Sequence, residues 1–318
     1  MRRMGSANAT ECVLCGALVT PFVTSEDYIS GEEFTVYTCP SCGLGRTLPQ
    51  KAPAELSQYY AKGYYKKRKS GADEYINRLR FKKVSRMAGT KKRILDVGCG
   101  NGALVETFSA AGWEAAGIEM APPEHFVSND AQKKIFIGDI REAPYPPKSF
   151  DVITLFHVLE HLSEPREYLA KIRELLTDGG LLVIEVPNLA SVQARLTGGK
   201  WFNLDVPRHV FHFTTHALAK MLEQSGFRIE HTTHYSPVYS FFGFLQSLLN
   251  LVTRRSNILF DLLNGKISLR NYASQRIRFL DLFLTALFFA PALALALPLT
   301  IIESCAKRGG IIVFYARL

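Results

Sequence analysis

The chain has 318 residues, which is enough for one α/β domain of ordinary size with an appended module. A hydrophobic content of 47% and a charged content of 21% are typical of a folded globular protein and exclude an intrinsically disordered one. The formal net charge of +9 is uneven, because Lys and Arg greatly outnumber Asp and Glu between residues 51 and 93. Such a segment favours anionic partners such as nucleic acid, phosphorylated metabolites or acidic lipid headgroups, although a solvated helix face has the same composition.

Four of the six cysteines form two Cys-x-x-Cys pairs in residues 1–48: Cys12, Cys15, Cys39 and Cys42. A glycine follows each pair, so one tight turn can present two thiolates to the same ion. No apolar run follows the N-terminal arginines, so we expect a cytoplasmic, reducing environment in which cysteines bind metal rather than form disulfides. The pairs therefore predict a zinc-ribbon module over residues 1–48 with one structural zinc ion, and we expect Cys99 and Cys305 to be unliganded.

Residues 49–90 are polar, basic and rich in tyrosine, which predicts a basic helical linker. From residue 91 onwards, short apolar runs alternate with helical stretches. The runs RILDVG, EAAGIE, KIFIG, FDVITLF and LLVIEV indicate strands, and ALVETFSAAG and PREYLAKIRELL indicate helices. This alternation predicts an α/β domain over residues 91–318 with a Rossmann-like parallel sheet, to which FRIEHTTHY and the final GGIIVFYARL add two strands.

The first of these strands runs into three glycines, Gly98, Gly100 and Gly102, before a helix begins. Glycines permit a tight turn and close approach of a ligand, and the helix N-terminus offers free backbone N–H groups. Glu119 ends the next strand, where a carboxylate can accept hydrogen bonds from both hydroxyls of a ribose. These features suit any adenosine-containing cofactor, so an NAD-dependent Rossmann oxidoreductase is one alternative.

Two further acids favour S-adenosylmethionine (SAM). Asp96 precedes the glycines, where a carboxylate would repel a pyrophosphate but attract the ammonium group of SAM, and Asp139 follows the third strand, where it can contact the adenine. The segments DVGCGNG, IE at Glu119, GD at Asp139 and SFDVI resemble the motifs of class I SAM-dependent methyltransferases. The resemblance covers residues 90–235 and returns in the final strand, and it implies a SAM cofactor and an antiparallel last strand.

The fourth strand is followed by HVLEH, and in that family a Glu-His pair at this place borders the reaction centre. A second histidine-rich stretch includes His209. Methyl transfer from a sulfonium needs no acid for the leaving group, so one base and good positioning are sufficient. We predict that His161 or His209 is this base and that Glu160 orients it. A divalent metal bound by the same three residues is an open alternative, which resembles the site of some ubiquinone-pathway O-methyltransferases.

A compact α/β domain does not need the hydrophobic insertion at residues 238–305. Residues 282–302 carry no charge and approach the length that spans a bilayer. Cations lie between this run and the apolar run that precedes it: Arg254, Arg255, Lys266, Arg270, Arg276 and Arg278. Because the last strand must rejoin the sheet on the side that the chain left, we expect a monotopic or re-entrant element against anionic lipid. A helical lid or a dimer face is the alternative.

The whole arrangement resembles bacterial sugar methyltransferases of surface-polysaccharide pathways, in which a tyrosine after the zinc module can help catalysis. The candidates are Tyr59, Tyr60, Tyr64 and Tyr65. The resemblance implies a small or lipid-linked glycan acceptor at the inner face of the membrane. An RNA methyltransferase with a zinc ribbon is an alternative that suits the basic segment, but no Asn/Asp-Pro-Pro-Tyr turn follows the fourth strand. A non-catalytic SAM-binding protein is another alternative, and the sequence leaves the oligomeric state open.

Overall fold

The computed structural model describes residues 11–60, 71–120, 126–267 and 279–318. These residues belong to two compact units that alternate along the chain. The accessory unit comprises Met1–Lys62, Pro187–Leu218 and His234–Ile312, and the sheet unit comprises Gly63–Val186, Ala219–Thr233 and Val313–Leu318. Five residues named above lie outside the described part of the chain: Tyr64, Tyr65, Arg270, Arg276 and Arg278.

The sheet unit contains a seven-stranded sheet with the order β10-β11-β8-β7-β4-β5-β6. Its strands are β4 (Arg93–Val97), β5 (Glu114–Glu119), β6 (Ile135–Ile137), β7 (Phe150–Phe156), β8 (Leu176–Pro187), β10 (Arg228–Thr233) and β11 (Ile311–Arg317). Neighbours among β4 to β8 pair in parallel, whereas β11 is antiparallel to β10. The predicted Rossmann-like sheet with an antiparallel last strand is confirmed.

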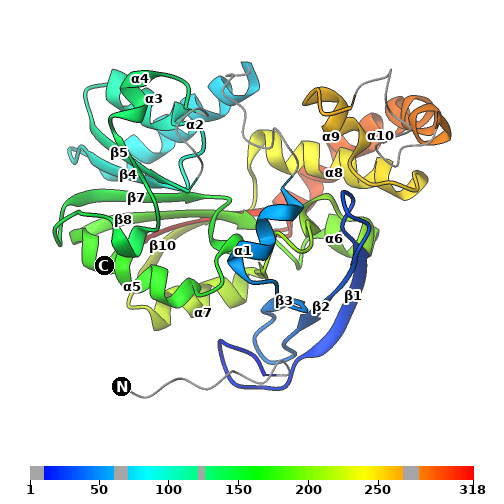
Figure 1. Ribbon diagram of the computed structural model, residues 1–318, viewed down its shortest axis with the longest axis horizontal. Coiled ribbons are helices and arrows are strands. Elements are labelled where there is room, and N and C mark those ends of the chain that lie inside the picture. Colours follow the sequence, from blue (N-terminus) through cyan, green and yellow to red (C-terminus); the bar gives the residue numbers. More distant parts are fainter. Residues whose placement is uncertain (1–10, 61–70, 121–125, 268–278) are drawn as a thin grey trace. The chain divides into compact units, whose positions relative to one another are not determined.

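Helices cover both faces of this sheet. They are α2 (Gly71–Ala88), α3 (Ala103–Ala110), α4 (Asn129–Gln132), α5 (Pro165–Leu175) and α7 (Thr215–Gln224). Figure 1 shows α2, α3 and α4 on one face and α5 and α7 on the other. The chain adds β5 and β6 on one side of β4 but β7 and β8 on its other side. The carboxyl ends of β4 and β7 therefore form the switch point at which open α/β sheets bind their ligands.

The accessory unit contains a four-stranded antiparallel sheet with the order β1-β2-β3-β9. Its strands are β1 (Thr20–Glu26), β2 (Glu33–Thr38), β3 (Gly45–Leu48) and β9 (Phe211–His212). The cysteine-bearing segment is thus completed by a strand from far along the sequence. This pairing links residues 187–218 to the N-terminal segment, and both belong to the same unit. The module boundary at residue 48 stays a prediction.

The helices of the accessory unit are α1 (Pro53–Leu56), α6 (Val192–Thr197), α8 (Pro237–Val252), α9 (Ile258–Leu263) and α10 (Phe279–Cys305). Helices α8 and α10 lie side by side in Figure 1 and pack through Phe244, Leu249, Ala292 and Ala296. Among the described residues, α10 is the one helix that is long and apolar enough to cross a membrane. The described residues of the hydrophobic insertion are therefore mainly helical.

A buried arginine holds three separate segments of the accessory unit together. Arg208 Nη1 donates to Asp27 Oδ1 at 2.9 Å and to the Tyr59 carbonyl oxygen at 2.6 Å. Its Nε and Nη2 donate to Asp205 Oδ1 at 3.0 and 2.7 Å. The guanidinium also lies 4.9 Å from the centre of the Tyr28 ring. Because Arg208 and Asp27 are both withdrawn from water, neither charge is stable without the other.

We expect Arg208→Leu to lower the free energy of unfolding by about 3–5 kcal/mol, because Asp27 would stay buried without its cation. Urea denaturation of the purified protein measures this change. The control is Arg195→Leu, an exposed arginine of α6 in the same unit, for which we expect a change below about 1 kcal/mol. An Arg208→Leu protein with the denaturation midpoint of the wild type would contradict the role given to this side chain.

Candidate functional site

The turn between β4 and α3 has the backbone of a ligand-binding loop. Gly98, Gly100 and Gly102 have φ values of +68°, +55° and +81°. Residues other than glycine rarely adopt this left-handed region of backbone conformation. A Cβ atom on Gly98 would lie 2.3 Å from Val158 Cγ2, so no larger residue fits there. A Cβ on Gly100 would meet nothing within 4 Å. The backbone at Gly100 therefore borders open space into which a ligand can come close.

Two buried carboxylates flank this turn. Glu119, at the end of β5, accepts hydrogen bonds from the backbone N–H groups of Gly100 and Met120, both at 2.7 Å. Asp96 lies in β4 and accepts a hydrogen bond from Thr154 Oγ1 at 2.7 Å. Burial raises the pKa of Asp96 to about 6, although the Thr154 hydrogen bond opposes this, so the carboxylate is mostly ionised at neutral pH. The turn thus carries negative charge on both sides.

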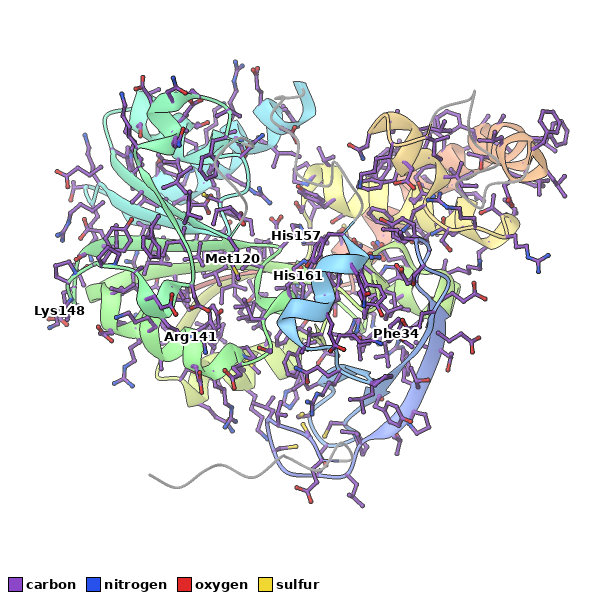
Figure 2. The ribbon with its side chains drawn as sticks, viewed as in Figure 1. Phe34, Met120, Arg141, Lys148, His157 and His161 are labelled. Atoms are coloured by element: carbon purple, nitrogen blue, oxygen red, sulfur yellow. The ribbon has the colours of Figure 1, made fainter. Side chains whose placement is uncertain are left out.

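The third predicted acid is held by an arginine. The Asp139 carboxylate accepts hydrogen bonds from the Arg141 backbone N–H at 2.8 Å, from the Arg141 guanidinium at 3.1 and 2.8 Å, and from the Tyr168 hydroxyl. Burial acts to raise the pKa of Asp139, but Arg141 and Tyr168 hold it below its usual value. Figure 2 labels Arg141 in the sheet unit. The contact of Asp139 with adenine stays a prediction. A bound adenine would donate a hydrogen bond to the carboxylate that already accepts hydrogen bonds from Arg141.

These residues fit a nucleoside cofactor. The carboxylates of Asp96, Glu119 and Asp139 come from the carboxyl ends of β4, β5 and β6 or from directly after them, and these strands are neighbours in the sheet. Met120, which the sequence reasoning did not use, is 68% exposed directly after Glu119 and can pack against a flat base (Figure 2). Met120 could have been identified from the sequence as the apolar residue that directly follows the acid at the end of the strand.

A charged cluster surrounds the turn after β7. His157 has a φ of +58°, which is rare for a residue with a side chain and marks a constrained turn. Its Nδ1 lies 3.4 Å from Glu160 Oε1, and its Nε2 lies 3.0 Å from Glu185 Oε1. Arg80 of α2 donates a hydrogen bond to the same Glu185 oxygen at 2.7 Å. Burial alone would lower the pKa of His157, but the two carboxylates raise it to about 9, so the ring is charged at neutral pH.

Sequence reasoning placed Glu160 in the site but did not identify its ion pair with His157. The spacing of three residues in HVLEH was a signal, since side chains three residues apart are close enough to pair in a tight turn. A carboxylate inside the apolar run LLVIEV was a second signal, because buried acids in strands are rare unless paired. His161 ends the short 3-10 helix η4 (Leu159–His161) and is half-buried in the same turn as His157 (Figure 2).

The remaining predicted histidine belongs to the accessory unit. His209 is buried, and its Nδ1 lies 2.9 Å from the carbonyl oxygen of Asn203. A carbonyl only accepts hydrogen bonds, so Nδ1 of His209 carries a proton. Nearby, burial lowers the pKa of His212 to about 3, and its Nε2 lies 2.9 Å from Thr47 Oγ1, so this ring is neutral. His161 and His209 belong to different units, and their joint role stays a prediction.

The described tyrosine candidates differ in exposure. Tyr59 is buried, and its hydroxyl donates a hydrogen bond to Glu32, so it has a structural contact within the accessory unit. Tyr60 is half-buried. A catalytic role for either stays a prediction.

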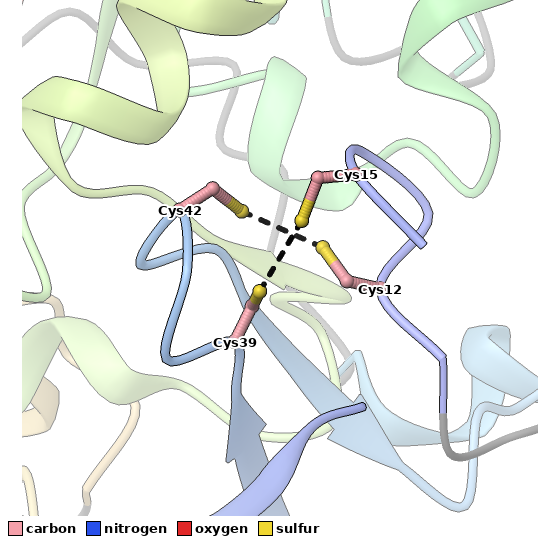
Figure 3. Close-up of side chains that lie close together, drawn as sticks. All are labelled: Cys12, Cys15, Cys39 and Cys42. Carbon is pink, nitrogen blue, oxygen red and sulfur yellow. Dashed lines mark hydrogen bonds between the residues drawn. The ribbon is translucent and has the colours of Figure 1, made fainter. Parts of the chain in front are cut away.

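The four paired cysteines come together at the end of the accessory sheet (Figure 3). The sulfurs of Cys12 and Cys42 lie 3.5 Å apart, those of Cys15 and Cys39 lie 3.4 Å apart, and all four lie within 4.8 Å of one another. In each pair the following glycine donates its N–H to the first cysteine's carbonyl oxygen at 2.8 Å. A tetrahedral zinc ion with Zn–S bonds of about 2.3 Å needs sulfurs about 3.8 Å apart. The cluster has the size and donor set for such an ion.

Comparisons with known proteins identify the family of the chain. A family described as "Methyltransferase domain" matches residues 66–232, which is more than half of the chain. The ubiquinone biosynthesis O-methyltransferase of Xanthomonas euvesicatoria pv. vesicatoria is 27% identical over 169 residues, covering 49% of this chain and 71% of the relative. The enzyme of the same name from Cereibacter sphaeroides is 32% identical over 124 residues, covering 36% of this chain and half of the relative.

A solved SAM-dependent methyltransferase from Archaeoglobus fulgidus is also similar, with 19% identity and a TM-score of 0.46, and the match covers 77% of this chain and 94% of the other. The family match, the strand order and the acid-flanked glycine turn lead to one assignment. The chain belongs to the methyltransferase-domain family and is a class I SAM-dependent methyltransferase.

Proposed function

We propose that this enzyme methylates a hydroxyl group of a lipid-linked sugar or glycan precursor at the cytoplasmic surface of the membrane. SAM-dependent transfer to a small-molecule acceptor follows from the family. The observation that carries the cofactor side is the open backbone at Gly100, with Glu119 hydrogen-bonded directly to it. Oxygen as the acceptor atom is supported by the printed names of the curated relatives, which specify O-methylation.

SAM, when bound, supplies a methyl group activated by its sulfonium. The chain's own residues bind and orient it. In this proposal Glu119 accepts hydrogen bonds from the ribose hydroxyls and ionised Asp96 attracts the ammonium group. Because the positions are fixed by strand ends and by the glycine turn, little reorganisation is needed when the cofactor binds.

A hydroxyl acceptor must lose its proton as the new bond forms, and a neutral histidine is suited to take it. His157 already carries a proton at neutral pH between two carboxylates, so it serves as a fixed positive charge. The hydrogen bond from His209 Nδ1 to the Asn203 carbonyl oxygen fixes the orientation of the His209 ring, which supports it as a candidate base. We therefore keep His161 and His209 as the two candidates for the base.

The membrane part of the proposal is supported by the polarity of α10. Its polar residues face inward and its apolar residues face outward, which is the reverse of a surface helix in water. Its buried polar residues face the accessory unit: Asp281, Thr285, Thr300 and Glu303. Its outer surface carries exposed apolar side chains: Phe279, Leu280, Phe283, Leu287, Phe288, Phe289, Leu293, Leu295, Leu297, Ile301 and Ile302. A helix surrounded by water places its polar residues outward, so this arrangement suits contact with lipid.

Both ends of α10 are bound to the accessory unit. Asp281 accepts a hydrogen bond from the Arg254 backbone N–H at 2.8 Å. Glu303 accepts hydrogen bonds from Gln193 Nε2 at 2.7 Å and from the Gly310 backbone N–H at 3.1 Å. A helix held along one face and at both ends is suited to lie in the membrane surface rather than to cross it.

We expect Glu119→Ala to weaken SAM binding by about tenfold or more, because hydrogen bonds to a charged group are worth about 1.5–3 kcal/mol. Isothermal titration calorimetry with SAM measures the effect. Glu114→Ala is the matched control, since Glu114 is exposed at the opposite end of the same strand. Measurable NAD binding by the wild type, or unchanged SAM affinity in Glu119→Ala, would contradict the proposed cofactor site.

We expect His161→Ala or His209→Ala to reduce methyl transfer by about 10²–10⁴-fold with SAM affinity unchanged, because loss of a general base has this effect. Methyl-labelled SAM is incubated with lipid and small-molecule extracts, and the transferred label is counted. His216→Ala, an exposed histidine at the start of α7, is the control. If both variants keep wild-type turnover, neither histidine is the base.

We propose a structural zinc ion at the four cysteines, and we expect about one zinc ion per purified chain. Cys39→Ser should lose the metal and lower the thermal midpoint, because a small segment of this kind depends on its metal to fold. Metal analysis and calorimetry read out both effects. Cys305→Ser is the control, because Cys305 is exposed and lies outside the cluster. Equal thermal midpoints with and without a chelator would count against a structural ion.

A further inference from the structure

Gln193 of α6 is a fully buried glutamine whose side chain joins three other elements of the accessory unit. Its Nε2 donates to Glu303 Oε1 of α10 at 2.7 Å and, more weakly, to the Ser240 carbonyl oxygen of α8 at 3.4 Å. Its Oε1 accepts a hydrogen bond from the indole N–H of Trp201 at 3.1 Å. A buried amide that makes all of its hydrogen bonds is costly to displace, so Gln193 fixes its partners.

Two glycines leave just enough room for this amide. A Cβ atom on Gly310, directly before β11, would lie 2.1 Å from Gln193 Nε2. A Cβ on Gly243 of α8 would lie 3.1 Å from Gln193 Oε1. The backbone of both segments therefore packs closely against the amide, and the side chain of Gln193 has little freedom to move.

Trp201 begins the segment that leads to the second candidate base. Its carbonyl oxygen accepts the Leu204 N–H at 3.1 Å, which closes the 3-10 helix η6 (Phe202–Leu204). The Phe202 N–H donates to Ser247 Oγ of α8 at 2.9 Å. The position of η6 therefore depends on the anchored indole of Trp201 at its start and on α8 beside it.

The carbonyl oxygen in the middle of η6 orients His209. Asn203 O accepts the hydrogen bond of His209 Nδ1 at 2.9 Å, and the His209 backbone N–H donates to the Asp205 carbonyl oxygen at 3.0 Å. Both acceptors belong to the backbone, so the direction of the imidazole follows the backbone of residues 201–205. A displacement of Trp201 would therefore move the ring. All of these contacts lie within the accessory unit.

We propose that Gln193 is a positioning residue for methyl transfer, which holds Trp201 and thereby the turn that orients His209. The hydrogen bond of Gln193 to Glu303 joins this turn to the anchored end of α10. A misplacement of about 1 Å near the reacting atoms can lower a rate by about 10²-fold, so a residue that touches no substrate can still control turnover. This inference rests on the proposed role of His209 as the base.

Gln193→Met tests the inference, because it keeps the length of the side chain but removes its hydrogen bonds. Methyl-labelled SAM is incubated with a lipid extract, and the rate of transfer is measured as a function of SAM concentration. We expect the rate at saturating SAM to fall about 10–100-fold while the KM for SAM stays unchanged, because His209 acts on the acceptor and not on the cofactor.

Gln246→Met is the matched control. Gln246 is a similarly buried glutamine of α8, and its side chain hydrogen-bonds to Asn250 Oδ1 and to the Phe260 backbone N–H. We expect this variant to keep the wild-type rate. An equal fall in Gln193→Met and Gln246→Met would assign the effect to general loss of buried hydrogen bonds and would overturn the inference.

A milder variant keeps the inference testable if Gln193→Met does not fold. Trp201→Phe retains an aromatic ring but removes the N–H that Gln193 accepts. We expect its rate at saturating SAM to fall about tenfold, again with the KM for SAM unchanged. Circular dichroism verifies that each variant is folded, and a folded Trp201→Phe protein with the wild-type rate would contradict the role given to this contact.

Combination with His209→Ala separates the inference from the proposed base. If Gln193 acts through His209, Gln193→Met changes the residual rate of His209→Ala by less than about twofold, because effects that pass through one group are not additive. The same fold loss in both backgrounds would place the effect of Gln193 elsewhere and overturn the inference. A slow His209→Ala with a wild-type rate in Gln193→Met refutes this inference alone. A wild-type rate in His209→Ala refutes the proposed base and, with it, the inference.

Discussion

The hydrogen bond from the Gly100 backbone N–H to the Glu119 carboxylate is the contact on which the proposed cofactor site depends. It joins the turn after β4 to the end of β5. The hydrogen bond therefore fixes the position of the left-handed turn relative to the proposed ribose-binding acid. The same turn approaches Val158 so closely that only glycine fits at residue 98. Val158 lies inside HVLEH, and the glycine turn is therefore packed directly against the turn that bears His157, Glu160 and His161. Within the sheet unit, the proposed cofactor turn and the proposed acceptor-side turn therefore pack against each other.

The sequence predicted the sheet because buried parallel strands are apolar on both faces, and runs such as RILDVG and LLVIEV stand out from their surroundings. It did not predict β9, since the two-residue pairing of Phe211–His212 with Gly45–Arg46 has no periodicity of its own. The deep burial of Arg208 was equally hidden. An arginine is almost always exposed, and two of its partners, Asp27 and Tyr59, lie 181 and 149 residues away along the chain.

The candidate site was predictable to a similar degree. Glycines and strand-ending acids are local features, so Asp96, Gly98 and Glu119 could be named from the sequence. The charge state of His157 is a tertiary property, because it depends on Glu185 and through it on Arg80, which lie 28 and 77 residues away along the chain. Only the folded chain shows that, of the two histidines in HVLEH, the first is held as a cation.

The inverted polarity of α10 constrains what this enzyme can be. Burying one Leu or Phe side chain lowers the free energy by about 1.5–3 kcal/mol. A row of such side chains exposed to water therefore raises the free energy of the protein considerably. The buried Asp281, Thr285, Thr300 and Glu303 have turned inward, which leaves the outer face without a polar group that would favour water. A lid over a soluble site would bury its apolar side, and its polar side would face out. The arrangement of α10 supports its proposed position at a lipid surface, from which the enzyme would take a membrane-borne acceptor.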